Sequence, residues 1–163
     1  MDNTPDEPLP NTDQLCTNSS KPHLLAFHVG AHYGFSSATV ITKVIKPYME
    51  HINATLKNCQ YGIRSKIHFL LFGLPAVNTI LQQKYPQQNH TLIKQYHKEI
   101  EAYLMTAPIQ TIFLDFFEVT REAIEDGRTS DGFHLLTDIN IVKVLTVVHV
   151  MNLLTHRLRC RKP

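Results

Sequence analysis

An aspartate and a histidine near the end of the chain have the spacing of an acid–base pair. Asp131 lies three residues before His134, and Gly132 stands between them. A turn at this glycine can bring the carboxylate against one imidazole nitrogen, which leaves the other nitrogen free to take a proton from a hydroxyl group. An ordinary Asp-Gly turn before a helix has the same spacing, and spacing alone favours that structural interpretation.

Alternating apolar segments predict the framework that must position this pair. Short apolar runs indicate buried strands, and a 3.6-residue period indicates amphipathic helices. The expected strands are 24–30, 66–73 and 109–115, and the expected helices are 37–58, 90–106 and 138–156. Three strand–helix alternations predict an α/β fold with a short parallel sheet and helices on both faces, that is, three α/β/α layers.

Several details of these helices follow from their residues. Pro47 should kink or split the first helix because proline lacks an amide hydrogen. Thr137 can cap the last helix, which is apolar on most sides, so we expect that helix to be mostly buried. The stretch from Asp115 to Thr137 is expected to be a long loop.

Function is expected at one edge of the sheet, because chemistry gathers at the carboxyl ends of parallel strands. The segments that leave those ends are 30–33, 73–78 and the loop after Asp115. The sequence therefore predicts that these three segments, with the Asp131 and His134 turn, converge there.

The end of the chain resembles a known enzyme family. The segments Phe113-Leu-Asp-Phe-Phe-Glu-Val-Thr120 and Asp131-Gly-Phe-His-Leu135, followed by a long apolar helix, are similar to the ending of SGNH (GDSL-like) hydrolases. The PC-esterase-like branch is the most similar; it includes the lumenal domain of sialic-acid O-acetyltransferase and the neurexophilin-and-PC-esterase domains. The resemblance covers about residues 24–154 and implies a flavodoxin-like sheet whose amino-terminal strands are missing.

The resemblance also implies an activity and roles for residues. It implies a serine esterase or O-acyltransferase that acts on hydroxyl esters such as an acetylated glycan, without a cofactor or a metal. His134 would be the general base and Asp131 the carboxylate that orients it. Gly30 matches an oxyanion-hole glycine, and His32 stands where the family has asparagine; a neutral imidazole can donate a hydrogen bond to an oxyanion.

The family's nucleophile block, a strand that ends in Gly-Asp-Ser, is absent from this sequence. Ser36 and Ser37 follow the wrong strand to replace it. We therefore expect a catalytically incomplete chain: a fragment of a longer product or a pseudoenzyme. The alternative is a non-catalytic interaction module. In either case strand 24–30 would have a bare edge, which could pair with another chain or with a missing segment.

Charge and composition limit the expected partners and the expected domain bounds. The net charge is +2 and the only dense basic run is at 157–162, so we expect no nucleic-acid binding. Residues 1–22 are expected to be a disordered tail, 23–158 a partial SGNH-like domain and 159–163 a basic tail.

Signals for cellular location conflict. Asn18, Asn53 and Asn89 begin possible N-glycosylation sites, yet no signal peptide is found. The three cysteines allow at most one internal disulfide. The expected location is cytoplasmic if the chain is complete and the lumen of the secretory pathway if it is a fragment.

Overall fold

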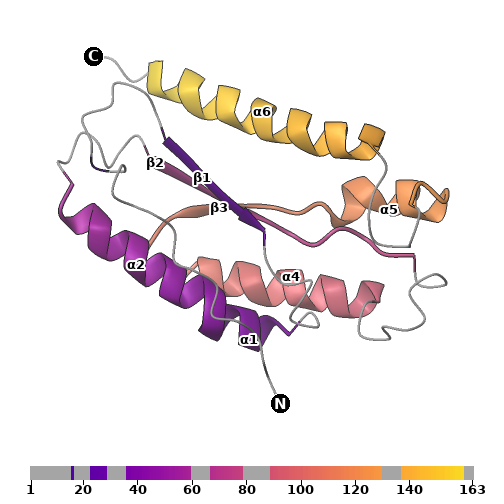
Figure 1. The fold of residues 1–163 in the computed structure, drawn as a ribbon, viewed down its shortest axis with the longest axis horizontal. Coiled ribbons are helices and arrows are strands. Elements are labelled where there is room, and N and C mark those ends of the chain that lie inside the picture. The colour runs from indigo at the N-terminus through magenta and orange to yellow at the C-terminus, as the bar shows by residue number, and fades with distance from the viewer. Residues whose placement is uncertain are drawn as a thin grey trace.

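The structure, a computed structural model, describes residues 16, 23–28, 36–59, 67–78, 89–129 and 137–159. Its centre is a three-stranded parallel sheet in the order β1-β2-β3 (Figure 1). The strands are β1 (His23–His28), β2 (Ile67–Phe72) and β3 (Thr111–Leu114). In this register Leu25 lies opposite Phe69, and Leu70 lies opposite Ile112. The predicted α/β fold with a parallel sheet is confirmed.

The first helical stretch contains a break just before its proline. It consists of α1 (Ser37–Val40), a π-helical turn (Ile41–Ile45) and α2 (Lys46–Lys57). Pro47 lies in the first turn of α2, directly after the π turn, and has no amide hydrogen to donate to a preceding carbonyl. In this stretch Val44 and Met49 are buried, whereas Tyr48 is only half-buried.

Helix α4 (His90–Leu104) lies with α2 on one side of the strands (Figure 1). The side-chain oxygen of Asn89 caps it by accepting a 3.0 Å hydrogen bond from the Leu92 amide. Its buried face contains Ile93, Tyr96 and Ile100, as the periodicity predicts. These side chains join those of α2 and β2 in one hydrophobic core.

Helix α5 (Phe117–Glu125) occupies part of the stretch that the sequence predicted to be a loop, so that prediction is wrong. Asp115 starts the helix by accepting a 2.7 Å hydrogen bond from the Phe117 amide. Burial of Phe117 and Ile124 on one face then holds it against the protein. A helix of nine residues has too few turns to give a clear periodic signal in the sequence.

Helix α6 (Thr137–Arg159) lies on the other side of the strands from α2 and α4 in Figure 1. Its predicted burial is wrong: Val144 and Leu145 are each 60% exposed, and Ile141 is 52% exposed. A helix that is apolar all round buries every face only if neighbours surround it, and the described chain covers α6 on one side. Within the described residues, no helix combines the length and hydrophobicity needed to cross a bilayer.

A disulfide between Cys16 and Cys59 ties the amino-terminal segment to the end of α2. The sequence predicted a disordered tail over 1–22, and the other residues of that range lie outside the described part. Disulfides persist in oxidising compartments such as the secretory pathway.

We expect Cys59→Ser to lower the free energy of unfolding by about 4 kcal/mol, because the bond closes a loop with a sequence separation of 43 residues. Urea unfolding measures this loss, and dithiothreitol should lower the wild-type midpoint to the same degree. Cys160→Ser is the matched control and should leave the midpoint unchanged. Equal midpoints for wild type and Cys59→Ser would show that the bond does not form.

Candidate functional site

The four residues that the resemblance assigns to the site, Asp131, His134, Gly30 and His32, lie outside the described residues. Their neighbours are described. His28 ends β1 two residues before Gly30. The residues just before and just after 130–136 contact one another. Thr129 is buried, and an ion pair of 2.9 Å joins Arg128 to Asp138.

A cavity of about 180 Å³ lies at the carboxyl edge of the sheet. Its walls come from the ends of two strands, from the residue before α5 and from α6. They are His28, Phe72, Gly73, Phe116, Lys143, Val144 and Val147. In Figure 1 the arrowhead of β1, helix α5 and the start of α6 lie toward the same end of the molecule. The described segments thus converge at the edge where the sequence predicted function.

A larger hollow of about 600 Å³ lies near the start of β3, beside Gln110 and Thr111. Glu101 is the one ionisable side chain among its described lining residues. We favour the smaller cavity as the candidate site, because ligands of parallel sheets bind outside the carboxyl ends of the strands.

The segment that leaves β2 is held by a buried histidine that the sequence analysis did not single out. The Leu74 amide donates a 2.7 Å hydrogen bond to Nε2 of His97, which is buried on α4. Because Nε2 accepts, the ring proton is on Nδ1, and Nδ1 lies 3.0 Å from Oδ1 of Asp115. This short contact is not aligned well enough to be a good hydrogen bond. His97 therefore bridges α4 to the ends of β2 and β3.

The pair of His97 and Asp115 resembles a catalytic dyad in composition, but its geometry is structural. The His97 side chain is only 5% exposed; its Nε2 accepts from the Leu74 amide, and its Nδ1 faces Asp115 rather than an open cavity. Burial raises the pKa of Asp115, but contacts from His97 and the Phe117 amide outweigh it, so the pKa lies below its usual value. The carboxylate therefore stays charged at neutral pH and fixes the histidine.

Gly73 is required by close packing at this point. A Cβ atom there would lie 2.9 Å from Nε2 of His97 and 2.9 Å from Cζ of Phe113. Both are buried or half-buried side chains that cannot move far. Any other residue would push His97 away from the Leu74 amide.

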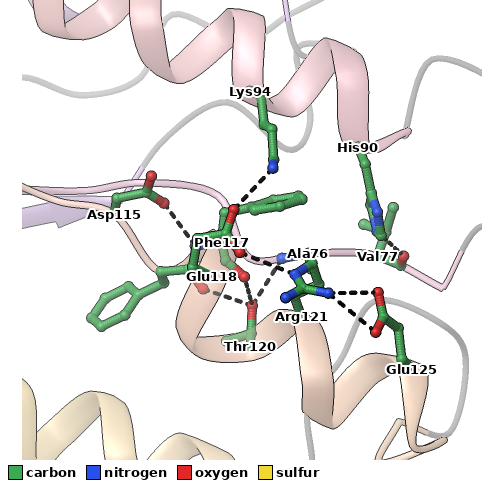
Figure 2. A network of polar contacts seen from close by, with 11 residues as sticks. Ala76, Val77, His90, Lys94, Asp115, Phe117, Glu118, Thr120, Arg121 and Glu125 are labelled. Carbon is green, nitrogen blue, oxygen red and sulfur yellow. Dashed lines mark hydrogen bonds and ion pairs between the residues drawn. The ribbon is translucent and has the colours of Figure 1, made fainter.

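Two more side chains hold the same segment (Figure 2). Thr120 of α5 accepts a 2.9 Å hydrogen bond from the Ala76 amide and donates a 2.7 Å bond to the Phe116 carbonyl. On α4, Nε2 of His90 lies 2.8 Å from the Val77 carbonyl. Residues 73–78 are thus anchored by α4 and α5 together, which gives the cavity a rigid wall at Gly73.

The serines and the glycosylation sites have structural contacts. Ser36 caps α1, and the Ser37 hydroxyl donates to Glu99 on α4. Neither serine is among the described residues that line the cavity. Asn89 caps α4, and Asn53 is half-buried on α2. Asn18 lies outside the described residues.

Comparison of the chain with protein-family models, curated proteins and solved structures finds no match. The functional assignment therefore depends on the residues and the geometry of the carboxyl edge.

We expect Thr120→Val to lower the free energy of unfolding by about 1–3 kcal/mol, because the buried Ala76 amide loses its acceptor. Chemical denaturation measures the change. Thr146→Val is the matched control: Thr146 makes the same hydrogen bond to the preceding turn but is on the more open helix α6. That control should change stability by less than about 0.5 kcal/mol. Similar small losses in both variants would contradict the anchoring role.

Proposed function

We propose that the chain is an SGNH-hydrolase-like domain of the PC-esterase branch, related to esterases and O-acetyltransferases that act on hydroxyl esters. In this proposal helices cover both faces of the sheet in three layers. The observation that carries it is the cavity at the carboxyl edge, with the end of β1 and helix α6 in its walls. In the sequence Gly30 and His32 follow β1 and Asp131 and His134 precede α6, and these two elements contribute described residues to the cavity walls.

The proposed roles follow from the chemistry of acyl transfer. The Asp131 carboxylate would hold one imidazole nitrogen of His134, and the other nitrogen would take the proton of an attacking hydroxyl. The oxyanion that then forms would accept hydrogen bonds from the Gly30 amide and the His32 ring. The proposed substrate class is an acetylated glycan, whose acetyl ester is the reacting group. This chemistry uses no cofactor and no metal.

The absence of a recognisable nucleophile limits the proposed activity. The sequence contains no Gly-Asp-Ser segment, and in a well-studied serine protease loss of the nucleophile lowers kcat by about a millionfold. We therefore propose that this chain is catalytically incomplete and retains the acid–base half of the site.

The Asp131–His134 pair can be tested without turnover. If the carboxylate lies against the imidazole, Asp131→Asn should lower the pKa of His134 by about one unit or more, because a nearby negative charge stabilises the imidazolium. Titration of the His134 Cε1 proton by NMR measures the pKa. Asp126→Asn, which removes a carboxylate at the end of α5, is the control and should leave it unchanged.

An unchanged pKa in Asp131→Asn would overturn the proposed pair. On the same proteins, wild type and His134→Ala should hydrolyse para-nitrophenyl acetate equally slowly. A wild-type rate more than about tenfold above that of His134→Ala would show that the site is complete after all.

A non-catalytic interaction module is the second candidate, favoured by the free edge of β1. Among the described residues, β1 pairs only with β2, and its sequence, His-Leu-Leu-Ala-Phe-His, has none of the lysines or prolines that protect edges. We propose a second copy of the chain as the occupant of this edge. Two identical uncharged strands can pair about a twofold axis without repulsion between like charges.

We expect this candidate to give a concentration-dependent dimer in light scattering. Ala26→Lys places a charge at an exposed position of β1 and should shift the protein to monomer by disfavouring strand pairing. Ala102→Lys, at an exposed position of α4, is the control and should dimerise as wild type does. A wild-type monomer that unfolds cooperatively would contradict the pairing of this edge with a second copy of the chain.

A further inference from the structure

The cavity at the carboxyl edge contains a cation that has no carboxylate partner among the described residues. Lys143 of α6 lines the cavity, and its Nζ lies 5.6 Å from the centroid of the Phe116 ring. The ion pairs of the described residues involve other basic side chains: Lys94, His97, Arg121 and Arg128. The aromatic ring is therefore the one described group that stabilises the ammonium.

Lys94 is a lysine of the same protein whose ammonium has both an aromatic and a carboxylate partner. Its Nζ lies 4.8 Å from the centroid of the Phe117 ring, and it also makes a 2.9 Å ion pair with Glu118 (Figure 2). Its side chain is 57% exposed, so water stabilises it as well. Lys143 has the aromatic contact but is half-buried, and burial lowers its pKa. A negative group that entered the cavity would stabilise the ammonium.

The size and walls of the cavity indicate the shape of such a group. Its volume of about 180 Å³ exceeds that of an engineered apolar cavity of about 150 Å³ that binds benzene. It is smaller than the roughly 300–1,000 Å³ typical of sites for drug-sized ligands. Phe72, Phe116, Val144 and Val147 supply apolar walls. A single ring or a short aliphatic chain fits these walls, whereas a fully hydrated anion does not.

The polar groups of the cavity leave Lys143 as the anchor. The Gly73 amide donates its hydrogen to the Leu114 carbonyl at 2.8 Å and has none left for a ligand. His28 lines the cavity and already makes another interaction in the protein. Of the described lining groups, the ammonium is therefore the one that can hold an anion.

We propose that this cavity binds a small organic carboxylate, with its apolar body between Phe72, Phe116 and Val147 and its carboxylate on Lys143. This site lies in the same cavity as the proposed esterase site, but its argument uses neither the nucleophile nor His134. It assigns Lys143 as a ligand-binding residue.

The probe is para-fluorobenzoate, followed by fluorine NMR on the purified full-length chain. Wild type should bind it saturably, and Lys143→Met should weaken binding by about tenfold or more, because the charge-assisted hydrogen bond is lost while the apolar stem is kept. Lys98→Met, at an exposed position of α4, is the matched control and should bind as wild type does. Val147→Phe should also abolish binding by filling the cavity, which provides a second variant if Lys143→Met does not fold.

The uncharged para-fluorobenzyl alcohol keeps the ring but lacks the carboxylate, so it measures how much the charge contributes to binding. Wild type should bind it more weakly than the acid. Equal binding of acid and alcohol, or equal binding of the acid by wild type and Lys143→Met, would overturn the proposal. Competition by inorganic phosphate as strong as that by benzoate would also overturn it, because the apolar walls would then contribute nothing. The esterase proposal is tested separately by the pKa of His134 and by ester hydrolysis, so its failure would leave this result intact.

Discussion

The buried passage of residues 73–78 out of the sheet is the constraint on which the described structure depends. A backbone that leaves a strand into the protein interior must find partners for its amides, since a buried unpaired amide is costly. Here the Leu74 amide is bonded to His97 and the Ala76 amide to Thr120. Gly73 is what allows the histidine to approach this closely. One segment thus fixes β2, α4 and α5 relative to one another.

Helix α6 is held in a different way. Its described polar ties to the rest of the molecule include the ion pair of Asp138 with Arg128 and the contact of Lys143 with the Phe116 ring. Ile141, Val144 and Leu145 remain largely exposed. The cavity lies between the well-anchored strand ends and this open helix. Its described walls combine apolar side chains with one lysine, Lys143, that has no carboxylate partner among the described residues.

Two proposals therefore concern one edge of the sheet but rest on different residues. The esterase-like proposal rests on the resemblance of the segments that carry Gly30, His32, Asp131 and His134. The carboxylate site rests on described geometry around Lys143. Both agree with the general rule that ligands of parallel sheets bind where the strands end. The disulfide of Cys16 with Cys59 is a bond of the kind that persists in oxidising compartments.

The sequence by itself determined the strands and the long helices, because hydrophobic period and turn residues are local properties. The edge where a site would lie stays a prediction from the parallel topology. It could not find helix α5, whose nine residues carry too short a period, or the exposure of α6, which depends on what surrounds that helix. Only the tertiary structure selected Cys16 and Cys59 among the possible cysteine pairs and brought His97 to Leu74, 23 residues away. Such pairings depend on how elements pack across the fold, and no spacing along the chain encodes them.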